Sequence, residues 1–144
     1  MKVHRANATW KKGLKDGSGE VETANGGIKS TYSFATRFGD STDGTTPDEL
    51  LGAAHASCFS MFLSALIEKK DITPEYIKTD ARVHLGEKDG GPHILKIELK
   101  TEASVPGITD ADFQKLVQDA KVGCPVSKAL AAVGDITVEA KLNG

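Results

Sequence analysis

The stretch TPDELLGAAHASCFSMFLSALIEK, residues 46–69, decides the fold of this 144-residue protein. It opens with a capping threonine, a proline at the first helical position and the carboxylate of Glu49 three residues after the cap. This order is typical of a helix N-terminus. No charged residue stands between Leu50 and Ile67, so we expect a long helix to about Lys69 that is buried nearly all round.

By length alone the charge-free part of this helix reaches the lower limit for a membrane span. His55, Ser57 and Ser60 interrupt it, however, and the chain has no second stretch of this kind. We therefore interpret it as a core helix and predict no contact with membranes. The first seven residues turn polar before an apolar segment develops, so no secretory signal is expected and a cytoplasmic location is predicted.

The chain before this helix is predicted to form an antiparallel sheet. Strands are expected over residues 3–10, 19–24 and 28–38. The dipeptide Asn25-Gly26 joins the last two, and this pair tolerates the positive φ of a tight hairpin turn.

The chain after the helix predicts three more strands and two more helices. Alternating apolar and polar residues favour strands, and capping residues favour helices. We expect strands over residues 77–85, 95–103 and 136–142, and helices over 109–122 and 125–133. The fold class is therefore α+β, with antiparallel sheets packed around a long buried central helix.

The size of the chain favours a single domain over residues 1–144. A helix that is apolar on every side needs cover on every side, yet one sheet hides only one face. Because the other helices are short, we expect a second copy of the chain to supply the cover in a two-fold dimer.

Composition excludes several classes of function. Eighteen basic against 20 acidic side chains give a net charge of −2, which disfavours nucleic acid as a partner. Two cysteines are too few for a disulfide scaffold and are wrongly spaced for zinc. The histidines outside the central helix have no ligand spacing, and residues 40–44 do not form a calcium loop, so we predict neither metal nor cofactor.

The two cysteines are the candidates for chemistry. Cys58 lies in the middle of the central helix, and Cys124 precedes Pro125 at the expected start of a short helix. Either residue could merely fill space, but N–H groups at a helix start stabilise negative charge on sulfur. A buried thiol needs a nearby cation to ionise, and Arg37, at the end of the third expected strand, is the candidate.

Glu49 has two possible roles. It is the third helical residue of a capping box, or it belongs to the same site as Cys58. Nine positions along a helix amount to about 13.5 Å and opposite faces, so one chain's Glu49 cannot reach its own Cys58. In the second case Glu49 comes from a partner subunit, and the site straddles the dimer interface.

Two other functions remain open from the residues alone. His55 lies one helical turn before Cys58, so a Cys–His pair for hydrolysis by acyl transfer is conceivable. No residue is evident that would orient the imidazole. The other alternative is a non-catalytic protein that binds a small apolar ligand and whose cysteines are inert.

Three segments carry a family resemblance: TRF (36–38), TPDELLGAAHASCFSM (46–61) and GCPVS (123–127). Together they resemble the OsmC branch of the OsmC/Ohr family of organic hydroperoxide reductases. The resemblance implies an intertwined homodimer with cysteines at the subunit interface, acting in oxidative and osmotic stress defence. It also implies reduction of organic hydroperoxides, and less well of hydrogen peroxide, by thiols alone.

By the same resemblance, Cys58 attacks the peroxide, Cys124 resolves the resulting sulfenic acid as a disulfide, and Arg37 and Glu49 form a pair that keeps Cys58 ionised. The implied reductant is an external dithiol of the lipoyl type. Phe38, Phe59 and Met61 neighbour the reacting residues in sequence. They are interpreted first as ordinary core residues; the alternative is an apolar substrate entrance, which would favour alkyl or fatty-acid hydroperoxides.

Overall fold

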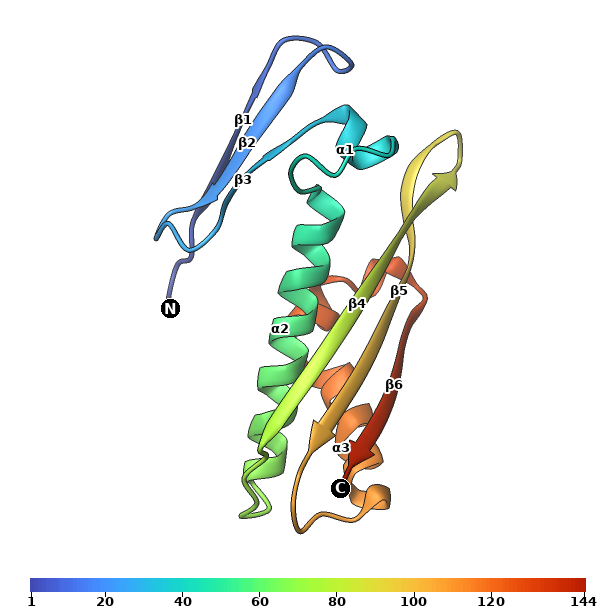
Figure 1. The fold of residues 1–144 in the computed structure, drawn as a ribbon. Coiled ribbons are helices and arrows are strands. Elements are labelled where there is room, and N and C mark those ends of the chain that lie inside the picture. The colour runs from blue at the N-terminus through green and yellow to red at the C-terminus, as the bar shows by residue number, and fades with distance from the viewer. The chain divides into compact units, whose positions relative to one another are not determined.

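The computed structural model describes all 144 residues, as two compact units over residues 1–50 and 51–144 (Figure 1). Each unit has its own three-stranded sheet. The α+β class predicted from the sequence is confirmed, and the assignment of residues 1–144 to one domain stays a prediction.

The first unit is an antiparallel sheet in the order β1 (Ala6–Lys11), β2 (Ser18–Thr23) and β3 (Lys29–Tyr32). The predicted hairpin joins β2 and β3. Gly26 has a φ of 74°, a conformation that glycine adopts without a steric penalty. Trp10 and Tyr32 stack across the sheet with their ring centroids 5.4 Å apart.

The prediction of a strand through residue 38 was wrong beyond Tyr32, because residues 34–38 form the short helix α1 (Phe34–Phe38). Ser33 and Thr36 form a reciprocal capping box. The Thr36 N–H donates to Ser33 Oγ at 3.1 Å, and the Ser33 N–H donates to Thr36 Oγ1 at 2.9 Å. These bonds satisfy N–H groups at the helix start, and Arg37 therefore lies in the last turn of a helix rather than at a strand end.

Helix α2 (Pro47–Glu68) begins and ends as the sequence predicted. The Glu49 N–H donates to Thr46 Oγ1 at 2.9 Å, and the Thr46 N–H donates to Glu49 Oε2 at 3.2 Å. The capping-box role expected for Glu49 is therefore present in the structure.

The sheet of the second unit is mixed. Strands β4 (Tyr76–Lys88) and β5 (Gly91–Ser104) form the predicted antiparallel hairpin, which turns at Asp89 and Gly90 with φ of 53° and 78°. Strand β6 (Ile136–Asn143) pairs parallel to β5, so the expectation of wholly antiparallel sheets was wrong here. The reason is the crossover formed by α3 (Asp110–Gly123) and α4 (Pro125–Ala129), after which β6 starts beside Ile97 of β5 and runs in the same direction.

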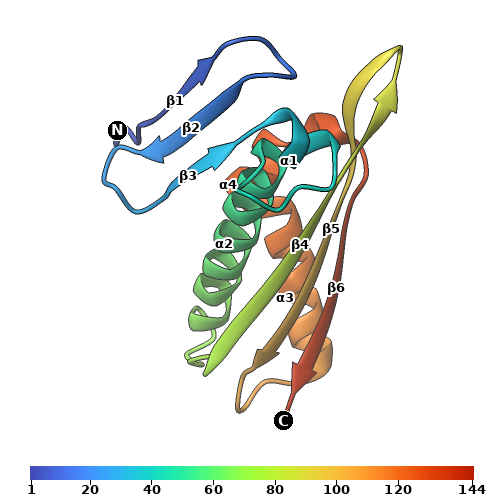
Figure 2. The same cartoon turned by 45° about the horizontal axis from the view of Figure 1, so that its top comes forward.

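Within the second unit, α2 and α3 cover the same face of the sheet (Figures 1 and 2). The core between them and the sheet consists of apolar side chains with little or no exposure. It includes Phe59, Leu63, Ile67, Ile97, Leu99, Phe113 and Val117. A chain of hydroxyl groups crosses the helix–sheet contact, with 2.7 Å from Ser60 Oγ to Thr79 Oγ1 and 2.9 Å from there to Thr101 Oγ1.

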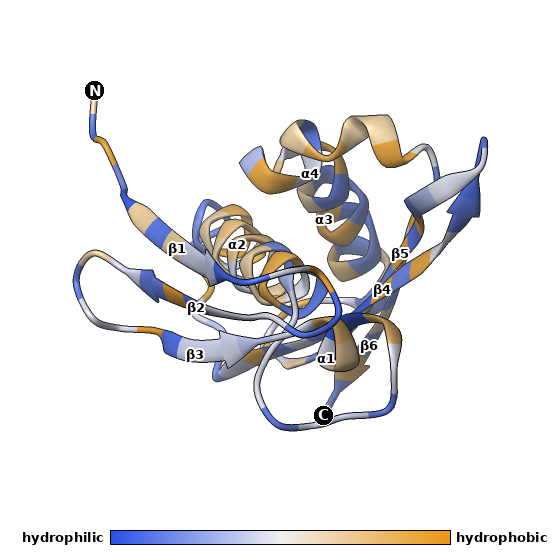
Figure 3. Ribbon diagram, turned by 90° about the horizontal axis from the view of Figure 1, so that it is seen from above, coloured by the Kyte–Doolittle hydropathy of each residue, from blue (hydrophilic) through white to orange (hydrophobic).

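Only one face of α2 is buried within a single chain. The opposite face exposes Ala54, Ser57, Met61 and Ala65 at intervals of about one turn, and Met61 is 74% exposed. The helix is mostly apolar around its circumference (Figure 3), and by length and composition it could cross a membrane. Burial nearly all round is thus not achieved by one chain, and cover by a second copy stays a prediction.

Candidate functional site

The second unit brings Cys58 and Cys124 together. Their Sγ atoms lie 3.0 Å apart, although the residues are 66 positions apart in sequence. Both thiols are free; Cys58 is half-buried and Cys124 is fully buried. A disulfide needs an S–S distance near 2.05 Å, so the two sulfurs are about 1 Å from bonding distance.

Cys124 occupies the junction of α3 and α4. Its N–H closes α3 by donating to the Ala120 carbonyl at 2.9 Å, and its carbonyl accepts the Lys128 N–H of α4 at 3.0 Å. Gly123 makes the close approach of α2 possible, because a Cβ there would lie only 2.7 Å from Cε1 of the Phe62 ring. Phe62 is one turn beyond Cys58, so this contact and the sulfur pair occupy neighbouring turns of α2.

The surroundings of Cys58 within its own unit do not favour ionisation. Burial raises the pKa of its thiol above the ordinary value, and the neighbouring Cys124 sulfur raises it further. A hydrogen bond from the Val126 N–H opposes these effects and lowers it. A reactive thiolate at neutral pH therefore needs an additional positive charge near Cys58.

Arg37 forms an ion pair with Asp48 in the first unit. Its Nε donates to Asp48 Oδ2 at 2.9 Å and its Nη2 donates to Asp48 Oδ1 at 3.2 Å. Within this chain Glu49 does not contact the guanidinium; its Oε2 accepts bonds from Thr45 Oγ1 and from the Thr46 N–H. Asp48 was not among the residues predicted for the site, although its place beside Glu49 made it an equally available carboxylate.

The guanidinium also borders an apolar pocket of the first unit. The pocket has a volume of about 260 Å³, and Arg37 Cζ lies 5.4 Å from the Phe38 ring centroid. Its lining is mainly aromatic: Trp10, Leu14, Tyr32, Ser33, Phe34, Arg37, Phe38 and Pro47. Phe38 thus borders a pocket, whereas Phe59 is fully buried in the core of the second unit. The core position preferred for Phe59 from the sequence is therefore confirmed.

His55 is fully buried and contacts α4. Its Nε2 lies 2.7 Å from Ser127 Oγ, whereas its Nδ1 has no hydrogen-bond partner. Burial lowers the pKa of the imidazole, which favours its neutral form. No hydrogen bond joins His55 to Cys58, so the Cys–His pair required for the hydrolase alternative is not formed. Ser127 was missed as a partner of His55, although its spacing of three from Cys124 matches that of His55 from Cys58.

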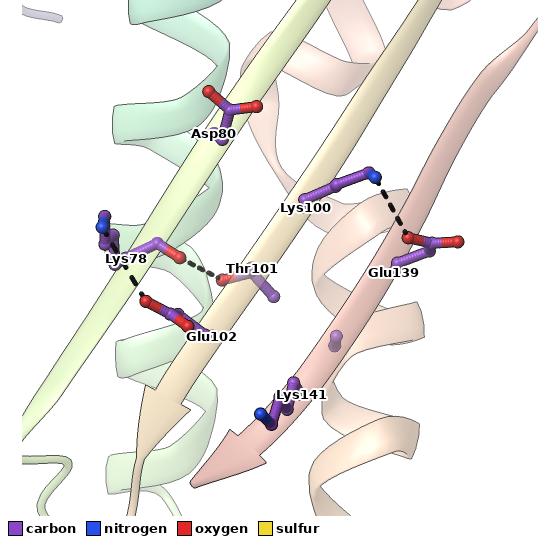
Figure 4. Close-up of a pocket in the computed structure, with 8 residues that line it drawn as sticks. Lys78, Asp80, Lys100, Thr101, Glu102, Glu139 and Lys141 are labelled. Atoms are coloured by element: carbon purple, nitrogen blue, oxygen red, sulfur yellow. Dashed lines mark hydrogen bonds and ion pairs between the residues drawn. The ribbon is translucent and has the colours of Figure 1, made fainter.

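One pocket of the second unit contains none of these residues. It has a volume of about 520 Å³ on the face of the sheet away from α2 and α3 (Figure 4). Its charges largely neutralise one another: Lys78 pairs with Glu102 and Lys100 with Glu139, both at 3.8 Å. No cluster of three or more side chains of the metal-ligating types is present anywhere in the chain. The candidate chemistry is therefore confined to the cysteine pair and Arg37.

Comparison with known proteins places the chain among relatives of similar length and fold. A protein-family model described as "OsmC-like protein" matches residues 39–139. "Peroxiredoxin OsmC" of Escherichia coli is 44% identical over 144 residues, 99% of each chain. An "Organic hydroperoxide resistance protein" of Xanthomonas axonopodis is 34% identical over 97 residues, 67% of this chain and 66% of the relative.

Solved structures agree with these sequence relationships. A crystal structure of an organic hydroperoxide resistance protein from Elizabethkingia anophelis is 26% identical, with a TM-score of 0.71 over 99% of this chain and 98% of the other. An OsmC-like protein from Vibrio cholerae has the same fold, with a TM-score of 0.78, 18% identity and coverage of 98% and 100%. Full-length sequence identity and shared fold together show that this chain belongs to the OsmC family.

Proposed function

We propose that this protein is a thiol-dependent peroxidase that reduces organic hydroperoxides to alcohols in oxidative-stress defence. The observation that carries the proposal is the 3.0 Å distance between Cys58 Sγ and Cys124 Sγ. The names of its relatives, a peroxiredoxin and an organic hydroperoxide resistance protein, support the same activity.

In the proposed cycle the Cys58 thiolate attacks the outer oxygen of the hydroperoxide. The O–O bond breaks, an alcohol leaves after protonation, and Cys58 becomes a sulfenic acid. The Cys124 thiol then condenses with the sulfenic acid, which forms the disulfide and releases water. An external dithiol, of the lipoyl type, returns both cysteines to thiols by exchange. The thiols carry all of the redox chemistry, so the cycle needs neither a metal nor an organic cofactor.

By the family resemblance, Arg37 supplies the positive charge for the Cys58 thiolate. A guanidinium remains charged at all relevant pH values and donates in a planar fork, so it can stabilise the thiolate and bind the peroxide oxygens. Asp48 orients that fork within the chain through two hydrogen bonds. Glu49 joins the site from a partner subunit. At the site, its free carboxylate oxygen can accept a further hydrogen bond from the Arg37 guanidinium.

The partner is a second copy of this chain. The exposed face of α2, with Met61 at its centre, is an apolar surface that a soluble protein covers by association. A two-fold axis that crosses α2 near Ala53 and Ala54, midway between Glu49 and Cys58, would bring the first turn of one helix near the middle of the other. The active sites then lie at the subunit interface of a cytoplasmic homodimer.

The pocket beside Arg37 supports an organic hydroperoxide as the substrate. Its lining is mainly apolar and aromatic, and apolar walls favour alkyl or aryl hydroperoxides over the small, strongly hydrated hydrogen peroxide. We therefore expect Phe38 to contact the organic part of the substrate.

The test is the intact mass of the reduced protein before and after one equivalent of cumene hydroperoxide. The wild type should lose two hydrogen atoms as the disulfide forms, whereas Cys124→Ser should gain one oxygen atom. Cys58→Ser should not change in mass, and it serves as the matched control for non-specific oxidation. An unchanged wild-type mass would show that the cysteines are inert. It would favour the alternative of a non-catalytic protein that binds a small apolar ligand.

A further inference from the structure

Two side-chain contacts connect α2 to α4. Cys58 Sγ lies 3.0 Å from Cys124 Sγ, and His55 Nε2 lies 2.7 Å from Ser127 Oγ. His55 is three residues before Cys58, and Ser127 is three residues after Cys124. Since residues three apart share one side of a helix, the two contacts occupy neighbouring turns of the same helix pair.

The contact between His55 and Ser127 is sealed from solvent. His55 has no exposed surface and Ser127 is 6% exposed. Burial lowers the pKa of His55, so its imidazole is neutral at pH 7 and carries one N–H. Of the two ring nitrogens, Nε2 contacts Ser127 and Nδ1 has no partner. The bond to Ser127 is therefore the one hydrogen bond that this imidazole makes.

Helix α4 depends on such contacts for its position. It has only five residues, and a helix of this length does not hold itself together in water. Cys124 shares its backbone between α3 and α4 through its bonds to Ala120 and Lys128, so any displacement of α4 also displaces the Cys124 sulfur.

We propose that the His55–Ser127 hydrogen bond is a positioning device for disulfide formation, one that holds α4 where the Cys124 thiol reaches an oxidised Cys58. This inference rests on the proposed function. The step it serves is internally balanced: the S–O bond of the Cys58 sulfenic acid and the S–H bond of Cys124 break, an S–S bond forms, and water leaves. Neither His55 nor Ser127 touches the reacting atoms in this scheme.

The bond acts mainly on one step of the cycle. Attack of Cys58 on the hydroperoxide does not use the Cys124 sulfur, and α4 contributes to this step through the Val126 N–H, whose hydrogen bond lowers the pKa of Cys58. Disulfide formation requires both sulfurs, and a misplacement of about 1 Å costs on the order of 100-fold in rate. A sulfenic acid that is resolved slowly meets a second peroxide and becomes a sulfinic acid, so loss of the bond diverts Cys58 to over-oxidation.

The test compares substitutions that remove or retain the bond. Ser127→Ala and His55→Leu remove it, Ser127→Thr retains a hydroxyl, and His55→Gln retains a side-chain nitrogen that reaches the position of Nε2. Each reduced protein is mixed with cumene hydroperoxide, quenched over time in the presence of dimedone, and analysed by intact mass. Loss of the reduced form reports the first step, and the disulfide, dimedone adduct and sulfinic acid report the fate of Cys58.

We expect Ser127→Ala and His55→Leu to slow the loss of the reduced form much less than they slow disulfide formation. They should form the disulfide about 10- to 100-fold more slowly, and should accumulate the dimedone adduct and a product with two added oxygen atoms. In Ser127→Thr and His55→Gln, oxidised Cys58 should be divided among the disulfide, the dimedone adduct and the sulfinic acid as in the wild type. A merely structural contact would lower stability in all of these variants without changing this partition.

The outcomes separate the inference from the function on which it rests. Wild-type partition in both Ser127→Ala and His55→Leu overturns the positioning role and leaves the peroxidase intact. A wild-type protein whose Cys58 is not oxidised at all overturns the proposed function instead. If Ser127→Ala fails to fold, His55→Asn, whose amide is too short to reach Ser127, replaces it with the same expected partition.

Discussion

Arg37 donates two hydrogen bonds to the carboxylate of Asp48, at 2.9 and 3.2 Å, and none to the adjacent Glu49. Asp48 is 8% exposed, so its charge is largely withdrawn from water and depends on the guanidinium for compensation. The orientation of Arg37, the one arginine in the proposed site, is therefore fixed within the chain by Asp48 and not by the expected Glu49.

Asp48→Asn should weaken the first unit, because an amide offers the guanidinium one acceptor in place of two charged oxygens. We expect a loss of about 1–3 kcal/mol in the free energy of unfolding, measured by urea denaturation. Glu49→Gln is the matched control: its amide oxygen can still accept the Thr46 N–H, and its loss should stay below about 0.5 kcal/mol. Equal losses in the two variants would contradict the assignment of Asp48 as the partner of Arg37.

Arg37→Ala should slow alkylation of Cys58 by iodoacetamide at pH 7. Burial raises the pKa of Cys58, and without a cation the reactive thiolate becomes rarer. The measurement uses the Cys124→Ser background, so that only one thiol reacts, with Arg82→Ala on the exposed face of β4 as the control. An alkylation rate equal to that of the control would remove Arg37 from the site.

Gly123→Ala should destabilise the second unit and slow disulfide formation. An added Cβ would lie 2.7 and 2.9 Å from two atoms of the Phe62 ring, and overpacking of this kind costs about 1–3 kcal/mol. Phe62→Leu should restore part of that loss in the double variant, a coupling that a thermodynamic cycle measures. Gly91→Ala, where a Cβ meets open space, should leave stability unchanged; a similar effect at both glycines would exclude the ring contact as the cause.

The stability of the protein should fall as the pH drops below about 6.5, in part because of His55. Its folded-state pKa is lowered by burial, so between that value and the ordinary 6.5 the unfolded chain binds a proton that the folded chain does not. Stability is therefore lost as pH falls through this window, with a slope of up to about 1.4 kcal/mol per pH unit.

His55→Gln keeps a hydrogen-bonding group and removes the titration, so unfolding midpoints at pH 7 and pH 5 should lie closer together than in the wild type. His93→Gln, at an exposed histidine, should retain the wild-type difference. An undiminished pH dependence in His55→Gln would show that other groups cause it.

Met61→Glu should convert the proposed homodimer into monomers. Met61 is 74% exposed on the apolar face of α2, and a carboxylate buried there without a partner would cost several kcal/mol of association energy. Sedimentation velocity measures the change in mass. Leu95→Glu adds the same charge at an exposed leucine of β5 and should leave the oligomeric state unaltered, whereas a monomeric wild type would refute the dimer itself.

Residues close together in sequence made most of the elements predictable. Thr46 and Glu49 define the start of α2 because a capping box involves only four consecutive residues. The β4–β5 hairpin follows from period-two alternation on both sides of Asp89 and Gly90. Helix α1 had an equally local signal in Ser33 and Thr36, but the apolar residues that follow β3 were interpreted as its continuation.

The sequence by itself determined the elements, the family and the chemical identity of the candidate residues, because each depends on residue type at short spacing. Tertiary structure alone decided that Arg37 pairs with Asp48, that Ser127 meets His55, that β6 runs parallel to β5, and that Cys58 lies within 3.0 Å of Cys124. The physical reason is that these contacts join different elements: Arg37 and Asp48 are 11 positions apart, and the two contacts between α2 and the Cys124–Ser127 segment are 66 and 72 positions apart. Their geometry is set by how the elements pack, which no local pattern encodes.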